Sequence, residues 1–192
     1  MNRREVVKLL AVAPLAVAFT WTAPEIDEAW RLVRLERRFQ PRFFTPHEWE
    51  TVRLLADLIL PRDERSGSAT DAGVAEVIDF LMADRDDERR QTAMRGGLAW
   101  VDSQCRERFG QDFLDCADAE RRALLDLIAW PAKAPAELSH GVEFFNSFRN
   151  LTASGFWSSK MGVRDLQYIG NRAIAEWRGC PEEQLRKLGL QQ

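Results

Sequence analysis

Two histidines and three cysteines are the residues of this 192-residue chain whose types are best suited to nucleophilic or metal chemistry. His47 is expected in the first turn of a helix and His140 in a loop, where a lone histidine is ordinarily solvated. Cys105, Cys116 and Cys180 show neither the C-x-x-C nor the C-x-x-C-H spacing. They therefore do not form a cysteine-rich metal site, an iron–sulfur site or a c-type haem site by themselves.

Carboxylates are the other groups that could do chemistry, as a general acid and a general base. Asp84, Asp86 and Asp87 cluster in a polar break of the kind that lies in solvent. Asp57 and Asp102 fall within predicted helices, and we expect each to be buried singly, as a cap or an ion-pair partner. The sequence contains no G-x-G-x-x-G, Walker or G-x-S-x-G motif. We therefore expect no catalytic, cofactor-binding or metal-binding residues in this chain.

The first residues have the pattern of an export signal. Adjacent arginines, Arg3 and Arg4, and then Lys8 precede an apolar run, Leu9 to Phe19, that is too short to span a bilayer. We interpret residues 1–23 as a twin-arginine signal peptide; the alternatives are an ordinary Sec signal or an uncleaved amphipathic N-terminus. Twin-arginine export carries folded proteins, commonly because they hold a cofactor. Because this chain shows no cofactor site, the cargo that needs the signal is expected to be a partner protein.

Export would place the cysteines in an oxidising compartment, where an odd number leaves one thiol without an intrachain partner. Cys105 and Cys116 either pair with each other or simply lie buried. Cys180, between Gly179 and Pro181, is expected in a turn and therefore accessible from outside. We hypothesise that Cys180 forms an intersubunit disulfide; the alternative is a free or buried thiol.

The composition also indicates a protein partner. The chain carries 27 basic and 30 acidic residues, a formal net charge of −3. An acidic balance with interspersed signs argues against nucleic acid or an anionic membrane as the main partner. Seven tryptophans and eleven phenylalanines stand beside a single tyrosine. Large aromatic side chains fill cores and also anchor protein–protein interfaces, so an excess near the C-terminus favours an interface there.

The elements that position these residues are predicted to be helices, because no segment sustains the alternation typical of strands. In one helix Thr45 is expected to cap the N-terminus, Pro46 to occupy the first position and Glu48 to complete a capping box. Gly110 is a natural C-cap for a longer helix that begins near Glu88. The expected helical ranges are 25–40, 45–60, 74–83, 88–109, 118–130 and 142–154.

From Gly155 onward, glycines alternate with large aromatic residues, a pattern that is poor for regular helix and suited to shaped loops. We therefore predict an all-α fold, an irregular bundle of about five to seven helices with aromatic and glycine-rich C-terminal loops. The predicted organisation is a signal peptide at 1–23, a charged N-terminal segment at 24–42 and a helical domain at 43–192.

A series of short motifs follows in order along the helical domain. They lie at Phe44–Trp49, Ala56–Pro61, Asp71–Val74, Ile78–Asp79, Gly155–Ser159, Tyr168–Asn171 and Trp177–Pro181. With these motifs the chain resembles the small (subunit 3, or gamma) subunits of gluconate 2-dehydrogenase-type flavoprotein complexes, over about Phe43 to Pro181. Trp157 and Ser158 depart from the Tyr and Thr that are common in that family.

The resemblance implies a non-catalytic partner of a large FAD-dependent oxidoreductase of the glucose–methanol–choline (GMC) type, which oxidises a sugar or sugar acid. FAD is then expected in the partner subunit and not in this chain. The small subunit is expected to supply the signal, with Arg3 and Arg4 addressing the twin-arginine translocase, and to help the large subunit mature. Some complexes add a multihaem cytochrome c subunit. The expected location is the periplasm, with membrane association through the complex.

The aromatic C-terminal segment is our candidate for the partner interface. The interface residues that we expect are Phe156, Trp157, Tyr168, Asn171, Trp177 and Cys180, the last as the covalent link. Two other functions stay open: a transient export chaperone that releases its client, and an independent periplasmic enzyme that uses carboxylates in an apolar cleft. Stable co-purification at a fixed ratio would separate a permanent subunit from a chaperone.

Overall fold

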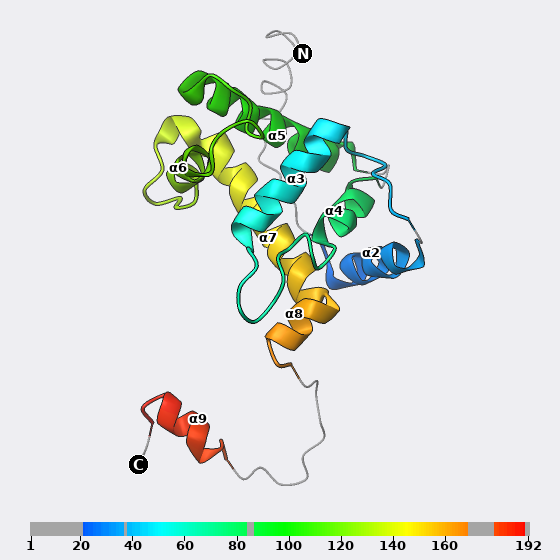
Figure 1. Cartoon of the computed structure of the whole chain (residues 1–192), viewed down its shortest axis with the longest axis vertical. Coiled ribbons are helices and arrows are strands. Elements are labelled where there is room, and N and C mark those ends of the chain that lie inside the picture. Colours follow the sequence, from blue (N-terminus) through cyan, green and yellow to red (C-terminus); the bar gives the residue numbers. More distant parts are fainter. Residues whose placement is uncertain (1–20, 37, 84–86, 169–178, 191–192) are drawn as a thin grey trace.

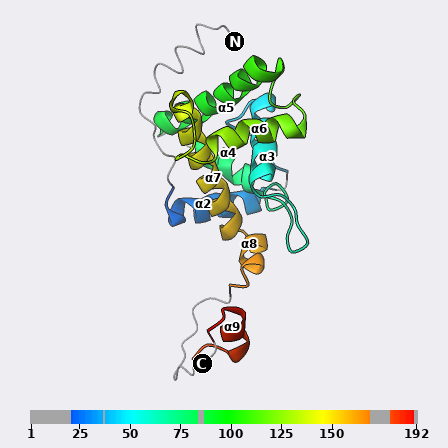
Figure 2. The ribbon, with the colours of Figure 1, turned by 90° about the vertical axis from the view of Figure 1, so that its left-hand side faces the viewer.

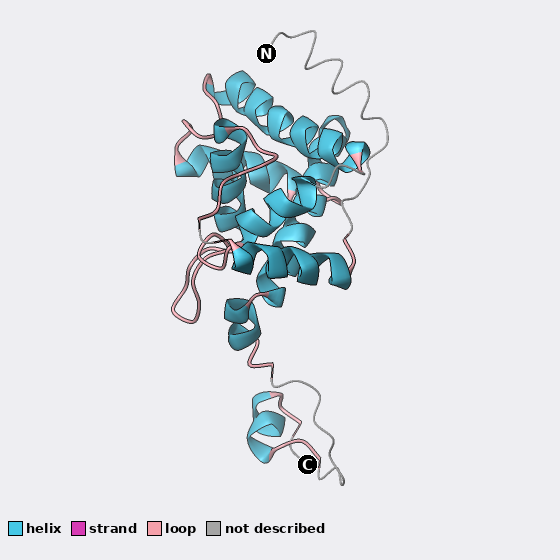
Figure 3. Cartoon of the chain, turned by 90° about the vertical axis from the view of Figure 1, so that its right-hand side faces the viewer, coloured by secondary structure: helices cyan, strands magenta, loops and turns pink. Residues whose placement is uncertain are grey.

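The computed structural model describes residues 21–36, 38–83, 87–168 and 179–190, and most of them form one bundle of helices (Figure 1). Within these ranges the chain contains eight α-helices, one short 3₁₀-helix and no strand (Figure 3). The helices are α2 (Ala23–Leu35), α3 (Pro46–Ile59), α4 (Val74–Ala83), α5 (Glu88–Phe109), α6 (Asp118–Ile128), η1 (Ala136–Leu138), α7 (Ser139–Ser158), α8 (Lys160–Asp165) and α9 (Glu182–Lys187). The all-α prediction is confirmed. The predicted signal residues Arg3 and Arg4 lie outside the described residues.

Helix α7 is the centre of the bundle, because it packs against α2, α3, α4, α5, α6 and α8. An apolar helix that contacts neighbours on several sides must bury side chains around much of its surface. The large buried residues of α7 are Val142, Phe144, Phe145, Phe148, Leu151 and Phe156. The predicted helix at 142–154 is therefore real, but longer at both ends.

The start of α3 has the predicted capping arrangement. Thr45 Oγ1 accepts a hydrogen bond from the Glu48 backbone N–H at 3.3 Å, and the Glu48 carboxylate accepts from the Thr45 N–H at 2.9 Å. Pro46 occupies the first turn, where its missing N–H costs nothing. The C-terminus of α5 is also as predicted, since Gly110 adopts the left-handed conformation with φ of 79°. Local sequence thus sets the ends of both helices.

Helix α2 ends at Leu35, before the predicted limit at Gln40, and belongs to the packed body. Its Ile26, Ala29 and Trp30 side chains are buried in a second apolar cluster with Val77 and Phe80 of α4. The helix begins after Thr22, whose N–H donates to the Glu25 carboxylate at 2.7 Å. The predicted charged segment at 24–42 therefore opens with a helix that is packed on the bundle.

The prediction of loops from Gly155 onward is wrong for the stretch up to Asp165. Residues 155–158 complete α7, and α8 follows after Ser159. A Cβ at Gly155 would lie only 3.2 Å from Val74 Cγ1, and one at Gly162 would lie 2.1 Å from the Phe156 carbonyl oxygen. These glycines serve close packing rather than chain flexibility, so tertiary contacts outweigh their poor helix propensity.

Candidate interaction surface

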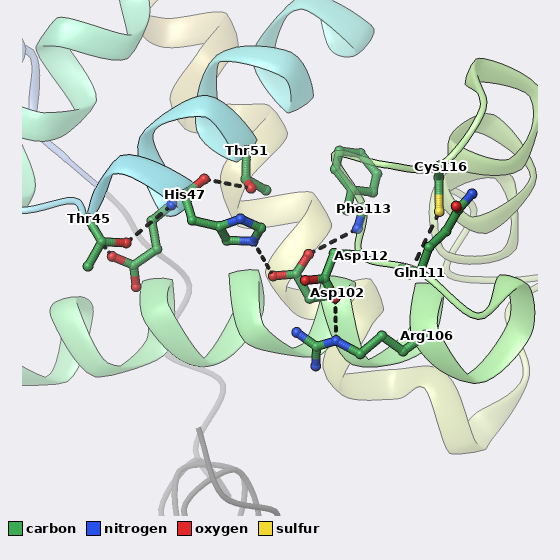
Figure 4. Close-up of polar contacts among 10 residues, drawn as sticks. Thr45, His47, Thr51, Asp102, Arg106, Gln111, Asp112, Phe113 and Cys116 are labelled. Atoms are coloured by element: carbon green, nitrogen blue, oxygen red, sulfur yellow. Dashed lines mark hydrogen bonds and ion pairs between the residues drawn. The ribbon is translucent and has the colours of Figure 1, made fainter.

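The two carboxylates singled out within helices each hold parts of the fold together. Asp102 of α5 is 6% exposed and lies 2.7 Å, through Oδ2, from His47 Nε2 on α3. Its Oδ1 accepts a hydrogen bond from the Phe113 backbone N–H at 3.1 Å (Figure 4). Asp57 accepts from the Thr70 N–H at 2.7 Å and so ties α3 to the loop before α4. The prediction for Asp102 is confirmed, because it is buried and pairs with His47, whereas Asp57 is partly buried and bonds a loop N–H, so it is neither a helix cap nor an ion-pair partner.

A histidine paired with an aspartate can activate a nucleophile, so the surroundings of the His47 ring matter. Among the described residues, the hydrogen-bond partner of the ring is Asp102, and the nearby Thr51 hydroxyl donates to the His47 carbonyl oxygen instead (Figure 4). The side chain of His47 is 45% exposed. Within the described chain the pair therefore joins α3 to α5 and meets no nucleophile.

Asp79 is a second buried carboxylate, which the sequence analysis singled out only as part of a motif. It is fully buried and accepts hydrogen bonds from three successive backbone N–H groups, those of Arg42, Phe43 and Phe44, at 2.7, 3.1 and 3.2 Å. These bonds fix the segment that leads into α3. An aspartate in the helix Val74–Ala83, whose other residues except Glu76 are apolar, was the signal that could have revealed this role.

The three cysteines have different environments. Cys105 and Cys116 are buried free thiols. The structure therefore agrees with the alternative in which the two cysteines lie buried without forming a disulfide. Burial, and then a hydrogen bond with the Cys116 thiol, raises the pKa of the Cys105 thiol to about 12. Cys180 is exposed and free, next to Gly179 with φ of 86°. The chain bends at Cys180, and the thiol is accessible, as expected.

The predicted interface residues do not share one environment. Phe156 is 2% exposed and belongs to the core, so its side chain is not available to a partner. Its neighbour Trp157, whose ring centroid lies 4.6 Å away, is 36% exposed, and Tyr168 is 60% exposed. Asn171 and Trp177 lie outside the described residues. Phe156 faces inward because it lies on the buried side of helix α7. We expected a loop at this position, and a loop would not have placed the side chain in the core.

Exposed apolar side chains gather toward the C-terminal end of the described chain. Leu166 is 51% exposed at the end of α8, and Leu188 and Leu190 are 69% and 62% exposed after α9. Helix α9 has no buried residue, and it stands apart from the bundle in all three ribbon views (Figures 1, 2 and 3). Apolar side chains left in water at the end of a chain are typical of a surface that a partner covers.

The described part of the chain contains neither a metal cluster nor a membrane-spanning helix. No group of three His, Cys, Asp or Glu side chains is arranged to hold a metal ion there. Nor does any described helix combine the length and the apolarity that crossing a bilayer requires.

The described fold is all-α. Its buried aspartates, Asp79 and Asp102, stabilise the fold, and apolar side chains near the C-terminal end of the described chain are exposed. The chain belongs to the gluconate 2-dehydrogenase subunit 3 family, whose profile matches residues 46–176, from the start of α3 to beyond α8. This confirms the resemblance drawn from the motifs. No functionally curated protein and no solved structure gave a match. By the family's description, its members are subunits of a dehydrogenase complex.

Proposed function

We propose that this protein is the non-catalytic small subunit of an exported FAD-dependent dehydrogenase of the GMC type, which acts on the CH–OH groups of a sugar or sugar acid. The observation that carries this proposal is the family match over residues 46–176. The described carboxylates and the histidine at position 47 support a non-catalytic role, because Asp57, Asp79 and Asp102 are engaged by backbone N–H groups. FAD belongs to the large subunit in this proposal.

Export is the second part of the proposal. Arg3 and Arg4 carry the twin-arginine signal, and the folded large subunit crosses to the periplasm with this chain. In cells that produce both subunits, Arg3→Lys/Arg4→Lys is expected to retain both of them in the cytoplasm, as measured by fractionation and immunoblotting. As a matched control, Arg37→Lys/Arg38→Lys makes the same two arginine-to-lysine changes outside the signal. This variant should be exported normally. Export of the large subunit without this chain would contradict this part.

The partner contact is assigned to the C-terminal end. We propose that Trp157 and Tyr168, exposed on the structure, contact the large subunit together with Asn171 and Trp177. Cys180 is free and exposed, which suits an intersubunit disulfide. A non-reducing gel of the complex should show a covalent band that Cys180→Ser abolishes and Cys105→Ser does not. If the complex is non-covalent in oxidising conditions, the disulfide hypothesis is wrong, but the proposed subunit role still stands.

A transient export chaperone is the second candidate, because exposed apolar side chains such as Leu188 and Leu190 also suit a protein that holds a client and releases it. The two functions differ in the fate of the complex. A permanent subunit remains bound to the large subunit at a fixed ratio after export, whereas a chaperone is recovered alone.

A further inference from the structure

A basic cleft lies at the end of the bundle from which the chain continues to α9. It has a volume of about 550 Å³ and lies between α2, the loop that joins α3 to α4, and α8. Figure 2 shows these three elements together at that end of the bundle. We call it the α2–α8 cleft. Its lining includes Trp30, Arg34, Arg65, Lys160, Arg164 and Asp165.

The charges of the α2–α8 cleft do not cancel. Its two acidic residues are already paired: Asp71 with Arg62 at 2.7 Å, and Asp165 with Arg65 at 3.1 Å. Three further cations line the cleft, all exposed and none with an ion-pair partner among the described residues. They are Arg34, Lys160 and Arg164. A concave surface that holds three unpaired positive charges attracts acidic groups, in a chain whose net charge is −3.

A hydrogen-bond donor in the wall of the cleft also lacks a partner. Trp30 lines the cleft and is 6% exposed, and its Nε1–H has no acceptor in the described structure. A buried donor without an acceptor costs free energy. The unpaired cations that line the cleft suit a ligand that carries carboxylate oxygens.

The position of the cleft indicates that its ligand is part of a protein. Trp157 lies two residues before the start of the cleft segment at Ser159, and Leu166 and Tyr168 follow directly after Asp165. These three exposed apolar residues flank the cleft-lining residues of α8 in the sequence, so apolar and charged groups of this segment are both available to a partner. A specific protein interface combines apolar contacts with complementary charges.

We propose that the α2–α8 cleft binds an acidic segment of the large subunit, with two or more Asp or Glu side chains placed against Arg34, Lys160 and Arg164. This inference rests on the proposed function. It adds where on this chain the large subunit binds and that the bound segment is negatively charged. Interfacial charge pairs of this kind fix the register of the two subunits and speed their association.

Zero-length cross-linking of the intact complex tests the contact directly. A carbodiimide joins an amine to a carboxylate that touches it, so Lys160 should be linked to an Asp or Glu of the large subunit, as identified by peptide mass spectrometry. Lys133, an exposed lysine beyond α6, is the matched control and should remain unlinked to that segment. Lys160→Arg keeps the charge but cannot be coupled, so it should bind normally and lose the cross-link.

Charge reversal tests whether the contact contributes to binding. The triple variant Arg34→Glu/Lys160→Glu/Arg164→Glu is expected to bind the large subunit at least about tenfold more weakly, because like charges then oppose each other. The control Arg89→Glu/Lys133→Glu/Arg149→Glu makes the same charge change at exposed sites outside the cleft, and should bind within about twofold of the wild type. The melting temperature of each variant verifies that it is folded.

The failures of the two proposals are distinguishable. If the wild-type chain binds no flavoprotein, the proposed function is wrong. If it binds one, but Lys160 stays unlinked and both triple variants bind alike, only the cleft assignment is overturned. Stabilisation of the isolated chain by free citrate through the same three cations, without any Lys160 cross-link in the complex, would also overturn it, since the cleft would then hold a small anion.

Discussion

At the scale of single residues, the buried carboxylates of Asp79 and Asp102 accept hydrogen bonds from other groups of the chain. Asp79 gathers three N–H groups, and Asp102 joins the His47 ring to the Phe113 N–H. Such carboxylates cost free energy to bury and are stable only while their hydrogen bonds are intact. Their substitution should therefore change stability, and any loss of dehydrogenase activity in the complex should follow from that.

Asp79→Ala should lower the free energy of unfolding by about 3 kcal/mol or more, because three backbone donors lose their acceptor at a buried site. Asp79→Asn keeps an acceptor oxygen and should cost less. The control Asp126→Ala, on the exposed face of α6, should change the value by less than about 0.5 kcal/mol. Urea unfolding followed by circular dichroism measures all three. Equal effects of Asp79→Ala and Asp126→Ala would contradict the assigned role.

Thiol alkylation should separate the three cysteines. With iodoacetamide at pH 8, the native chain should be modified once, at Cys180, because Cys116 is 2% exposed and the pKa of Cys105 is raised to about 12. Alkylation requires the thiolate, so the Cys105 thiol becomes reactive in the folded state only as the pH approaches that value.

Unfolding without reductant should expose all three thiols to the reagent, as counted by intact mass. Cys180→Ser should give no modification of the native chain. If only one thiol reacts after unfolding, Cys105 and Cys116 are joined by a disulfide, and the free-thiol assignment is wrong.

At the scale of elements, helices α5 and α7 pack closely because a glycine on each helix lies against an aromatic ring of the other. A Cβ at Gly97 of α5 would lie 1.9 Å from Phe144 Cδ2 of α7, and a Cβ at Gly141 of α7 would lie 2.1 Å from the ring of Trp100 on α5. Each glycine thus leaves room for a ring of the other helix. The position of α7 at the centre of the bundle depends on these two contacts.

Gly97→Ala and Gly96→Ala should have opposite effects on stability. A methyl group at Gly97 overlaps Phe144 and should cost about 1–3 kcal/mol or more, whereas a Cβ at Gly96 meets no atom within 4 Å. Gly96→Ala should therefore stabilise the chain by about 0.5–1 kcal/mol, since alanine favours a helix interior. Thermal unfolding of the two variants measures this difference. Stabilisation by both variants would show that helix propensity outweighs the overlap with Phe144, and destabilisation by both would contradict the open space at Gly96.

Sequence predicted the elements best where local chemistry decides them. The cap at Thr45, the C-cap at Gly110 and the role of Asp102 follow from residues near in sequence or from the cost of burying a charge. Gly155 gave the wrong prediction, because a glycine beside large aromatics fits a loop and a tightly packed helix equally well. The three cations of the α2–α8 cleft come from two helices far apart in the sequence, so only the fold brings them together.

At the scale of the whole molecule, a packed bundle is joined to a C-terminal end that buries little of its apolar surface. The bundle has a continuous core built on α7, while α9 contributes no buried residue. The cations of the α2–α8 cleft, the exposed Trp157 and the free Cys180 all lie on the C-terminal side of the fold or border it in sequence. Our account is that this end of the protein completes its structure against the large subunit.

The measurement that tests this account most directly is the purification of the tagged chain from the periplasm, with an absorbance spectrum and a quantitative denaturing gel. We predict a yellow complex with flavin absorbance, in which one large subunit accompanies this chain at a ratio that stays constant through gel filtration. A colourless protein, recovered alone and with a sharp unfolding transition, would contradict the account and favour the chaperone or the independent enzyme.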